Sequence, residues 1–250
     1  MRADARSTLI LAVTLGLSTA CGPLELVQAP DPSVGLVAYW SFDETTGSLV
    51  CDRSGQGHDG VLTGGTWRPT GGHLGGALSL ASGDYVTVQG FPAATPDWTV
   101  SVWVRYAPAD IGTDLSTIVT TEIPSTGGWE LQGPVNADTA ALQFSYNRDS
   151  RYNTLGCCQI QPDTWMHVTA VVNGAAPDGQ RMAILYDGRN AHVVLPVSGP
   201  ILPGNGTLHI GIEEIPGKLE WPFRGTIDEP RIYDRALNAA EVQALDAPPF

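Results

Sequence analysis

The chain has 250 residues, 42% hydrophobic and 16% charged, which is enough to bury one sizeable core. Its 29 glycines and 19 prolines have no fixed period, which excludes collagen, and they would interrupt long helical bundles. The net charge is −13, from 13 basic and 26 acidic residues. This charge argues against DNA or RNA as a partner, because neutralising phosphates needs a basic face. The composition leaves a single all-β sandwich or two small domains.

The first twenty residues have the pattern of a secretory signal peptide. Arg2 and Arg6 precede the apolar run 9–17, which is too short to span a bilayer, and the small residues 18–20 follow it. The final Ala20-Cys21 resembles the lipobox of bacterial lipoproteins, in which the cysteine becomes the lipidated first residue, although Ser18 stands where that pattern prefers an aliphatic residue. The alternative is ordinary cleavage nearby, with Cys21 left as a thiol.

This resemblance implies a signal peptide over 1–20 and a lipidated N-terminus with a tether over 21–34. It places the protein in the bacterial cell envelope, at the outer membrane or the cell surface. The lipid anchor would be its only contact with a membrane, since no later segment is long and apolar enough to span one.

Three cysteines remain after Cys21, namely Cys51, Cys157 and Cys158. In an oxidising compartment, the simplest arrangement pairs Cys51 with one of the other two. A bridge between Cys157 and Cys158 would be strained, because their Cα atoms lie only about 3.8 Å apart across a trans peptide. The sequence therefore favours a structural disulfide and leaves its connectivity open.

From residue 35 onward the apolar residues alternate with a period of two, which is typical of strands. We predict strands over 77–80, 85–88, 98–105, 141–146, 165–172 and 182–186, separated by turns rich in Gly, Asp and Asn. Near the C-terminus, Asn238 with Glu241 predicts a capped short helix. Many short strands in one continuous stretch favour a single antiparallel sandwich or jelly roll over residues 35–247.

Several short sequence segments occur in the same order as in one protein family. They are segments 35–44, 52–60, 75–80, 98–104, 165–168, 185–188 and 225–237, which read GLVAYWSFDE, DRSGQGHDG, GGALSL, WTVSVWV, WMHV, LYDG and GTIDEPRIYDRAL. Together they resemble a LamG-like jelly-roll domain of the concanavalin A-like lectin/glucanase superfamily. The resemblance implies two antiparallel sheets packed face to face, with the first and last strands close together. Pro230 replaces an aliphatic residue of the closing strand, which predicts an edge position or a bulge there.

Catalytic patterns are absent from the sequence. Glycosidases need two carboxylates beside the scissile bond, and the Glu-x-Asp-x-(x)-Glu pattern of the glucanase relatives does not occur here. Glu213 and Glu214 are adjacent and would point to opposite faces of a strand. There is no Gly-x-Ser-x-Gly motif, and His167 lies within a predicted strand as a packing residue. We therefore expect a non-enzymatic protein, with a divergent polysaccharide hydrolase as the less favoured alternative.

The same resemblance suggests a calcium site. If the first and last strands are neighbours, Asp43 and Asp228 approach one another, and Asp84 is a third candidate ligand. The alternative is that Asp228 pairs with Arg231 and that Asp43 begins a turn.

The aromatic residues are the candidates for ligand binding. Trp129 and Trp221 lie in loop-like sequence, where we expect exposure, while Trp103 with Arg105, and Tyr146, could line the outer face of a sheet. Packing is the alternative for each, and the scattered arginines form no recognisable clamp for an anion. We expect an exported, membrane-anchored binding module that recognises carbohydrate through rim loops and aromatic rings. The alternative is an adhesion module that binds an envelope protein.

Overall fold

The computed structural model describes residues 31–111, 115–121, 127–133, 141–148, 151–176, 182–187, 189–190, 206–215 and 217–246. The expected signal peptide and Cys21 lie outside the described residues. Residues 31–34, which the sequence places in the tether, contact the folded domain. The Tyr233 hydroxyl donates to the Pro32 carbonyl at 3.0 Å, and the Arg235 side chain donates to the Val34 carbonyl at 2.8 Å.

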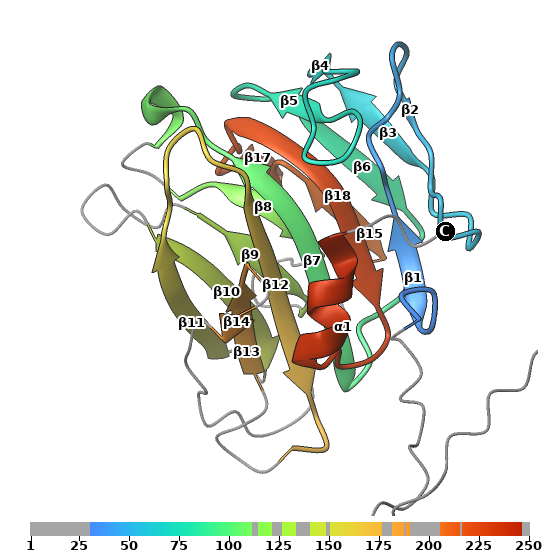
Figure 1. The fold of residues 1–250 in the computed structure, drawn as a ribbon, viewed down its shortest axis with the longest axis vertical. Coiled ribbons are helices and arrows are strands. Elements are labelled where there is room, and N and C mark those ends of the chain that lie inside the picture. The colour runs from blue at the N-terminus through green and yellow to red at the C-terminus, as the bar shows by residue number, and fades with distance from the viewer. Residues whose placement is uncertain are drawn as a thin grey trace, which may run out of the picture.

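The described residues form two antiparallel sheets packed face to face (Figure 1). Sheet A has the strand order β14 (Arg189–Asn190), β13 (Met182–Tyr186), β12 (Met166–Asn173), β7 (Asp97–Arg105), β18 (Gly225–Tyr233), β5 (Leu78–Leu80) and β4 (Thr66–Trp67), with β1 (Leu36–Tyr39) also paired to β18. Sheet B has the order β11 (Arg151–Gln159), β10 (Ala141–Arg148), β9 (Trp129–Gln132), β8 (Thr117–Thr120), β15 (Thr207–Ile210), β6 (Tyr85–Gln89), β3 (Gly60–Thr63) and β2 (Leu49–Val50).

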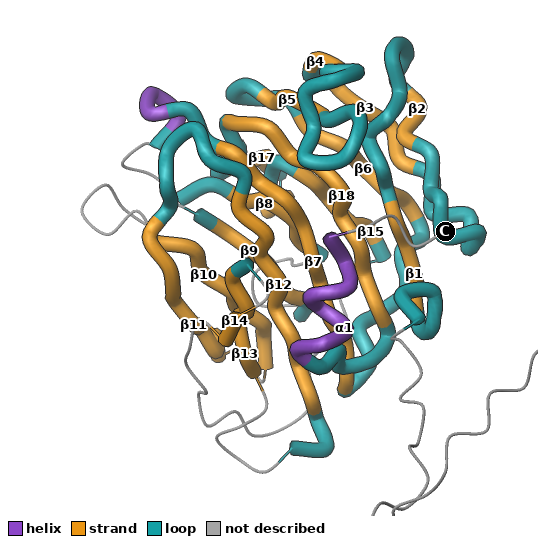
Figure 2. The backbone as a smooth tube through the Cα atoms, viewed as in Figure 1, coloured by secondary structure: helices purple, strands orange, loops and turns teal. Residues whose placement is uncertain are grey.

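Strands are the main regular secondary structure and are joined by extensive loops, as Figure 2 shows. A separate hairpin pairs β16 (Glu213–Ile215) with β17 (Lys218–Glu220). The helical segments are α1 (Ala239–Gln243) and the 3-10 turns η1 (Pro108–Asp110) and η2 (Ala244–Asp246). The predicted all-β sandwich with a short C-terminal helix is therefore confirmed.

The period of two in β7 places its residues as the sequence predicts. Val100 and Val102 point between the sheets and are fully buried in the main core. Thr99 and Ser101 point to the opposite face, yet they are fully buried as well. A second apolar cluster lies on this outer face of sheet A, where Val242 and Leu245 of the C-terminal helical segment pack on it (Figure 1). Sheet A is therefore covered on both sides around α1.

Helix α1 begins as predicted. The Asn238 side chain accepts hydrogen bonds from the backbone N–H groups of Ala240 and Glu241, and the Glu241 side chain accepts one from the Asn238 N–H. This reciprocal arrangement satisfies backbone donors that the first turn of a helix leaves unpaired.

The closing strand β18 lies inside sheet A, between β7 and β5, and also pairs with β1. The expected closeness of the first and last strands is thereby confirmed. Pro230 does not occupy an edge strand. Instead, the register of β18 against β7 shifts between Asp228 and Arg231, and Glu229 adopts a φ of 55°. The bulge accommodates Pro230, which lacks the N–H that a central strand donates.

The favoured pairing of Cys51 with Cys157 or Cys158 is not found. Cys51 is a free thiol directly after β2, at one edge of sheet B, whereas Cys157 and Cys158 belong to β11 at the opposite edge. Seven strand spacings of about 4.8 Å separate these edges, far beyond the reach of a disulfide. Cys158 is disulfide-bonded, and its partner sulfur lies outside the described side chains.

The helices found in the described residues are too short to cross a membrane.

Candidate functional site

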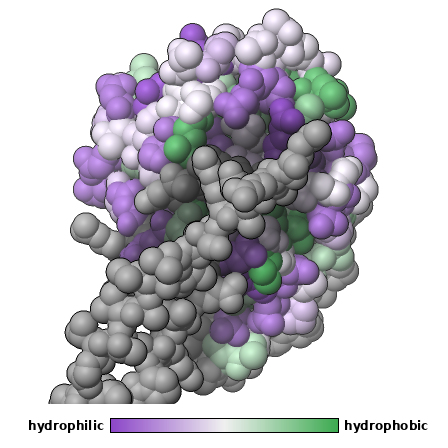
Figure 3. Space-filling model, turned by 45° about the vertical axis from the view of Figure 1, so that its right-hand side comes forward, coloured by the Kyte–Doolittle hydropathy of each residue, from purple (hydrophilic) through white to green (hydrophobic). Residues whose placement is uncertain are grey.

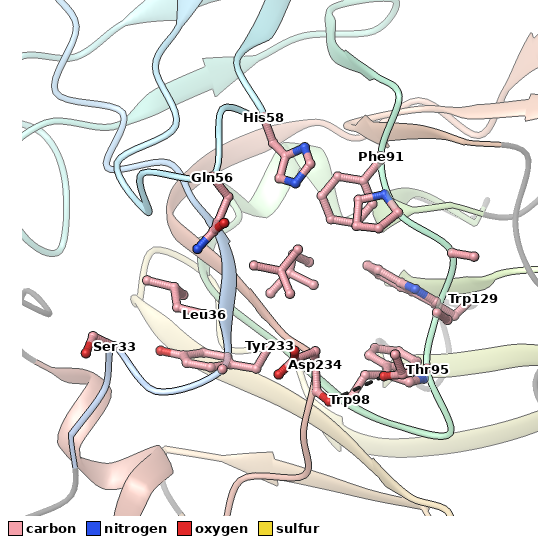
Figure 4. A pocket seen from close by; sticks show the side chains of 16 residues that line it. Ser33, Leu36, Gln56, His58, Phe91, Thr95, Trp98, Trp129, Tyr233 and Asp234 are labelled. Atoms are coloured by element: carbon pink, nitrogen blue, oxygen red, sulfur yellow. Dashed lines mark hydrogen bonds between the residues drawn. The ribbon is translucent and has the colours of Figure 1, made fainter.

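The candidate site is a pocket of about 450 Å³ at the end of the sandwich where β7 begins (Figure 4). Its lining comes from β1, from the loop that contains His58, from residues 91–95 between β6 and β7, and from the ends of β9 and β18. The volume lies within the range of pockets that hold small ligands. Segments far apart in the sequence therefore build a single concave site.

Aromatic rings form one side of this pocket, which we call the aromatic pocket. The Trp98 and Trp129 rings stack with centroids 4.5 Å apart, and the His58 and Phe91 rings lie 5.2 Å apart. Figure 4 shows these four rings along the same side. The indole N–H of Trp98 is buried and has no hydrogen-bond partner in the described part of the chain. Flat rings of this kind suit the C–H face of a sugar.

The opposite side of the aromatic pocket and its mouth are more polar. Ser33, Gln56 and Asp234 are exposed and line this side, together with the buried Leu36 and the half-buried Val37. The Thr95 hydroxyl donates to the Asp234 carbonyl at 3.3 Å, which joins the loop before β7 to the end of β18 (Figure 4). Polar groups opposite an aromatic wall can hydrogen-bond to the hydroxyl groups of a sugar while the rings pack against its C–H groups.

The predicted ligand residues do not meet in one place. Trp129 lines the aromatic pocket, but it belongs to β9 and is only 2% exposed, so the expected exposed loop position is wrong. Arg105, at the far end of β7, lines another pocket. Trp221 is half-buried between β17 and β18, and Tyr146 lies in β10, with its side chain outside the described part.

Trp103 does lie on the outer face of sheet A, but it is covered. Its ring stacks between His73, at 3.4 Å, and His167, at 4.7 Å, and the residue is 8% exposed. Because histidine rings stack on Trp103, its ring faces are not free to stack on a sugar. His58 and Phe91 were missed by the sequence reasoning, because only the fold brings their loops beside Trp98.

Each of the expected calcium ligands accepts a hydrogen bond from a backbone N–H group. Asp43 and Asp228 hold the same loop, since Asp43 accepts from the Gly76 N–H at 2.7 Å and Asp228 from the Leu74 N–H at 3.0 Å. The Asp84 carboxylate instead accepts from the Ala81 N–H, in the turn between β5 and β6. Among the described residues, no group of three His, Cys, Asp or Glu side chains could hold a metal. Calcium takes six to eight oxygens, so a site at Asp43 and Asp228 would need further ligands from backbone carbonyls or water.

Asp228 does not pair with Arg231. The bulge turns Arg231 towards Glu229, and the two side chains form a buried ion pair in which the Tyr39 hydroxyl donates to Glu229 at 2.8 Å. The Asp228 carboxyl is fully buried, and this burial raises its pKa to about 8.

Two groups of described residues resemble parts of catalytic sites but line none of the three pockets described here. The Ser101 hydroxyl lies 2.7 Å from His167 Nε2, but both side chains are buried in sheet A, and burial lowers the pKa of His167 to about 3. Glu130 and Glu213 are hydrogen-bonded to each other, and burial raises the pKa of Glu213 to about 7. None of these four residues lines a pocket described here.

Another pocket, of about 440 Å³, lies between the outer face of sheet B and the β16–β17 hairpin. His209 lies within it, 3.1 Å from the Glu214 carboxylate. The exposed large apolar residues of the described chain are Val34, Leu49, Val61 and Leu219. On the face drawn in Figure 3, hydrophobic residues form small patches separated by hydrophilic ones. Of the three pockets described here, the aromatic pocket is the one with a wall of aromatic rings.

The family follows from a sequence match. A family model described as the concanavalin A-like lectin/glucanases superfamily matches residues 80–243. This match covers more than half of the chain, so the chain belongs to that superfamily. No curated protein sequence matches the chain.

Solved structures share the fold at low sequence identity. Domain 4 of AbnA, an extracellular arabinanase from Geobacillus stearothermophilus solved in complex with arabinotriose, is 20% identical with a TM-score of 0.62. That alignment covers 85% of this chain and 98% of the other. The binding domain of Paraclostridial Mosquitocidal Protein 1 is 18% identical, with a TM-score of 0.66, and the alignment covers 86% of this chain and 52% of that domain.

The binding domain of botulinum neurotoxin serotype D is also similar, with 15% identity and a TM-score of 0.64. The alignment covers 86% of this chain and 51% of that domain. The chain thus spans about half the length of the two toxin binding domains. At these identities the likeness establishes the shared jelly-roll fold.

Proposed function

We propose that the protein is a non-catalytic carbohydrate-binding module whose aromatic pocket takes a neutral sugar unit. The observation that carries this proposal is the pocket itself, in which four aromatic rings face exposed polar side chains. The arabinotriose bound to the similar arabinanase domain supports a saccharide as the ligand class.

Blocking the pocket mouth tests this proposal without disturbing the core. Ala93 is exposed and lines the aromatic pocket, so Ala93→Trp would fill the space that a sugar needs. We expect the unmodified full-length protein to bind neutral glycans on an array, and A93W to lose at least about tenfold in affinity. Binding should be unchanged by a calcium chelator if Asp43 and Asp228 act only as acceptors for backbone N–H groups.

Ala81→Trp provides the matched control. Ala81 is also exposed, but it lines the pocket at the other end of β7. A81W should bind neutral glycans like the unmodified protein, and both variants should unfold at similar temperatures. Absence of glycan binding by folded protein would overturn the proposal and favour the protein–protein adhesion module.

We further propose that the protein is exported and anchored in the bacterial cell envelope through a lipid on Cys21. The basis is the sequence alone, namely the basic start, the short apolar run and the Ala20-Cys21 ending. Mass spectrometry of the protein from membranes should show an acylated peptide that begins at Cys21. Cys21→Ser should abolish acylation and release the protein from the membrane fraction. A mature protein with unmodified Cys21 would contradict the anchor.

A further inference from the structure

A second pocket, of about 600 Å³, lies at the end of β7 opposite the aromatic pocket. Arg105, the last residue of β7, lines it, whereas Trp98 near the start of the strand lines the aromatic pocket. Seven residues at about 3.3 Å each separate the two positions by roughly 23 Å. The two pockets are therefore distinct sites.

Strand register brings polar side chains together in this second pocket, which we call the arginine pocket. Thr226 of β18 lies opposite Ser79 of β5 on one side and opposite Arg105 of β7 on the other. Residues directly opposite one another project from the same face of a sheet. Arg224 lies two residues before Thr226 and lines the same pocket. Two arginines that are 119 positions apart in the sequence thus share one cavity with hydroxyl groups.

Both guanidinium groups are available to a ligand. The Arg105 guanidinium lies 5.0 Å from the centre of the Trp165 ring, a contact that holds its orientation while leaving its N–H groups unused. Within the described residues, neither Arg105 nor Arg224 forms an ion pair or a side-chain hydrogen bond. Unpaired arginines that line one cavity favour binding of a carboxylate or another oxyanion.

The pocket also contains two carboxylates. The Asp110 side chain accepts from the Ala107 N–H at 3.3 Å and so belongs to turn η1. Asp163 also lines the pocket, and its side chain has no hydrogen bond within the described part of the chain. A bare anion is repelled by such a carboxylate, whereas a sugar acid could place its carboxylate on the arginines and a hydroxyl on Asp163.

We propose that the arginine pocket is a second ligand site, which binds the carboxylate of an acidic saccharide. This inference does not depend on the neutral-sugar site, because it rests on different residues at the other end of the sandwich. The chain as a whole is acidic, with a net charge of −13, so recognition depends on this local pair of arginines rather than on the overall field.

Isothermal titration of the full-length protein with oligogalacturonate tests the proposal. We expect saturable binding that weakens as salt is added, since the ligand and the arginines are oppositely charged. The methyl ester of the same oligosaccharide lacks the charge and should bind at least about tenfold more weakly. Arg224→Gln and Arg105→Gln should each lose at least about tenfold in affinity, and R105K should recover part of the loss.

Controls separate this site from folding effects and from the aromatic pocket. Arg53→Gln removes an exposed arginine from outside the arginine pocket and should bind oligogalacturonate normally. A81W should block oligogalacturonate alone, and A93W should block neutral glycans alone, so failure of one proposal leaves the other measurable. The proposal is overturned if oligogalacturonate does not bind, if R224Q binds it normally, or if inorganic sulfate binds while the saccharide does not.

Discussion

Replacing Arg231 with methionine is expected to lower the free energy of unfolding by about 3 to 5 kcal/mol. Arg231 is 1% exposed, and its guanidinium donates to the Leu245 carbonyl at 2.7 Å and to the Glu229 carboxylate. It also lies 4.8 Å from the centre of the Tyr39 ring. Without Arg231, the Glu229 carboxylate would be buried without its cation, and the C-terminal helical segment would lose its link to β18.

Urea unfolding followed by tryptophan fluorescence measures this loss. The double variant Arg231→Met with Glu229→Gln should be less destabilised than R231M alone, because no unpaired charge remains in the core. Arg235→Met is the matched control, since Arg235 forms an ion pair with Glu241 in a partly exposed position. We expect its cost to stay below about 1 kcal/mol. A similar loss in R235M and R231M would contradict the role assigned to burial.

Asp228→Asn is expected to remove a strong pH dependence from the stability of the protein. The pKa of Asp228 is raised from its ordinary value of 3.8 to about 8 by burial, so the folded protein holds a proton there that the unfolded chain releases. The contribution to stability is fully present below about pH 4 and is lost as the pH rises to about 8. At about 1.4 kcal/mol for each of about four pKa units, the loss is on the order of 6 kcal/mol.

The measurement compares D228N with the unmodified protein by urea unfolding at intervals from pH 4 to pH 8. The variant should gain relative stability as the pH rises, because its amide cannot ionise. Glu213 acts in the same direction, as burial raises its pKa to about 7, so some pH dependence remains in D228N. Asp234→Asn, which changes an exposed carboxyl, should leave the pH profile unaltered. Parallel profiles for D228N and the unmodified protein would refute the assignment.

Local pattern was sufficient to predict much of the fold. The alternation of residues 98–105 predicted both the strand and the face that packs in the core, because side-chain direction alternates along any strand. Asn238 with Glu241 predicted the start of α1 for an equally local reason. Pro230 predicted an edge or a bulge, and the position of β18 in the middle of sheet A made it a bulge.

Local sequence pattern predicted less of the candidate site. Gly127 and Gly128 gave Trp129 the sequence of a loop residue, yet the residue begins strand β9 and packs on Trp98. The cysteine count suggested that Cys51 pairs with Cys157 or Cys158. In the structure, Cys51 lies at one edge of sheet B and the other two belong to the strand at the opposite edge. In each case the missing information was strand order, which depends on pairings between distant segments.

The sequence by itself determined the family resemblance, the all-β class, the main strands, the C-terminal helix and the closeness of the first and last strands. The class, the strands and the helix depend on side-chain period, turn residues and capping, which act within a few residues, whereas the closeness of the first and last strands was implied by the family resemblance. Only the tertiary structure decided which side chains share a cavity: His58 and Phe91 with Trp98 and Trp129 at one end, and Arg105 with Arg224 at the other. The physical reason is that strand order and register, set by packing of the whole sandwich, bring together residues that no local pattern connects.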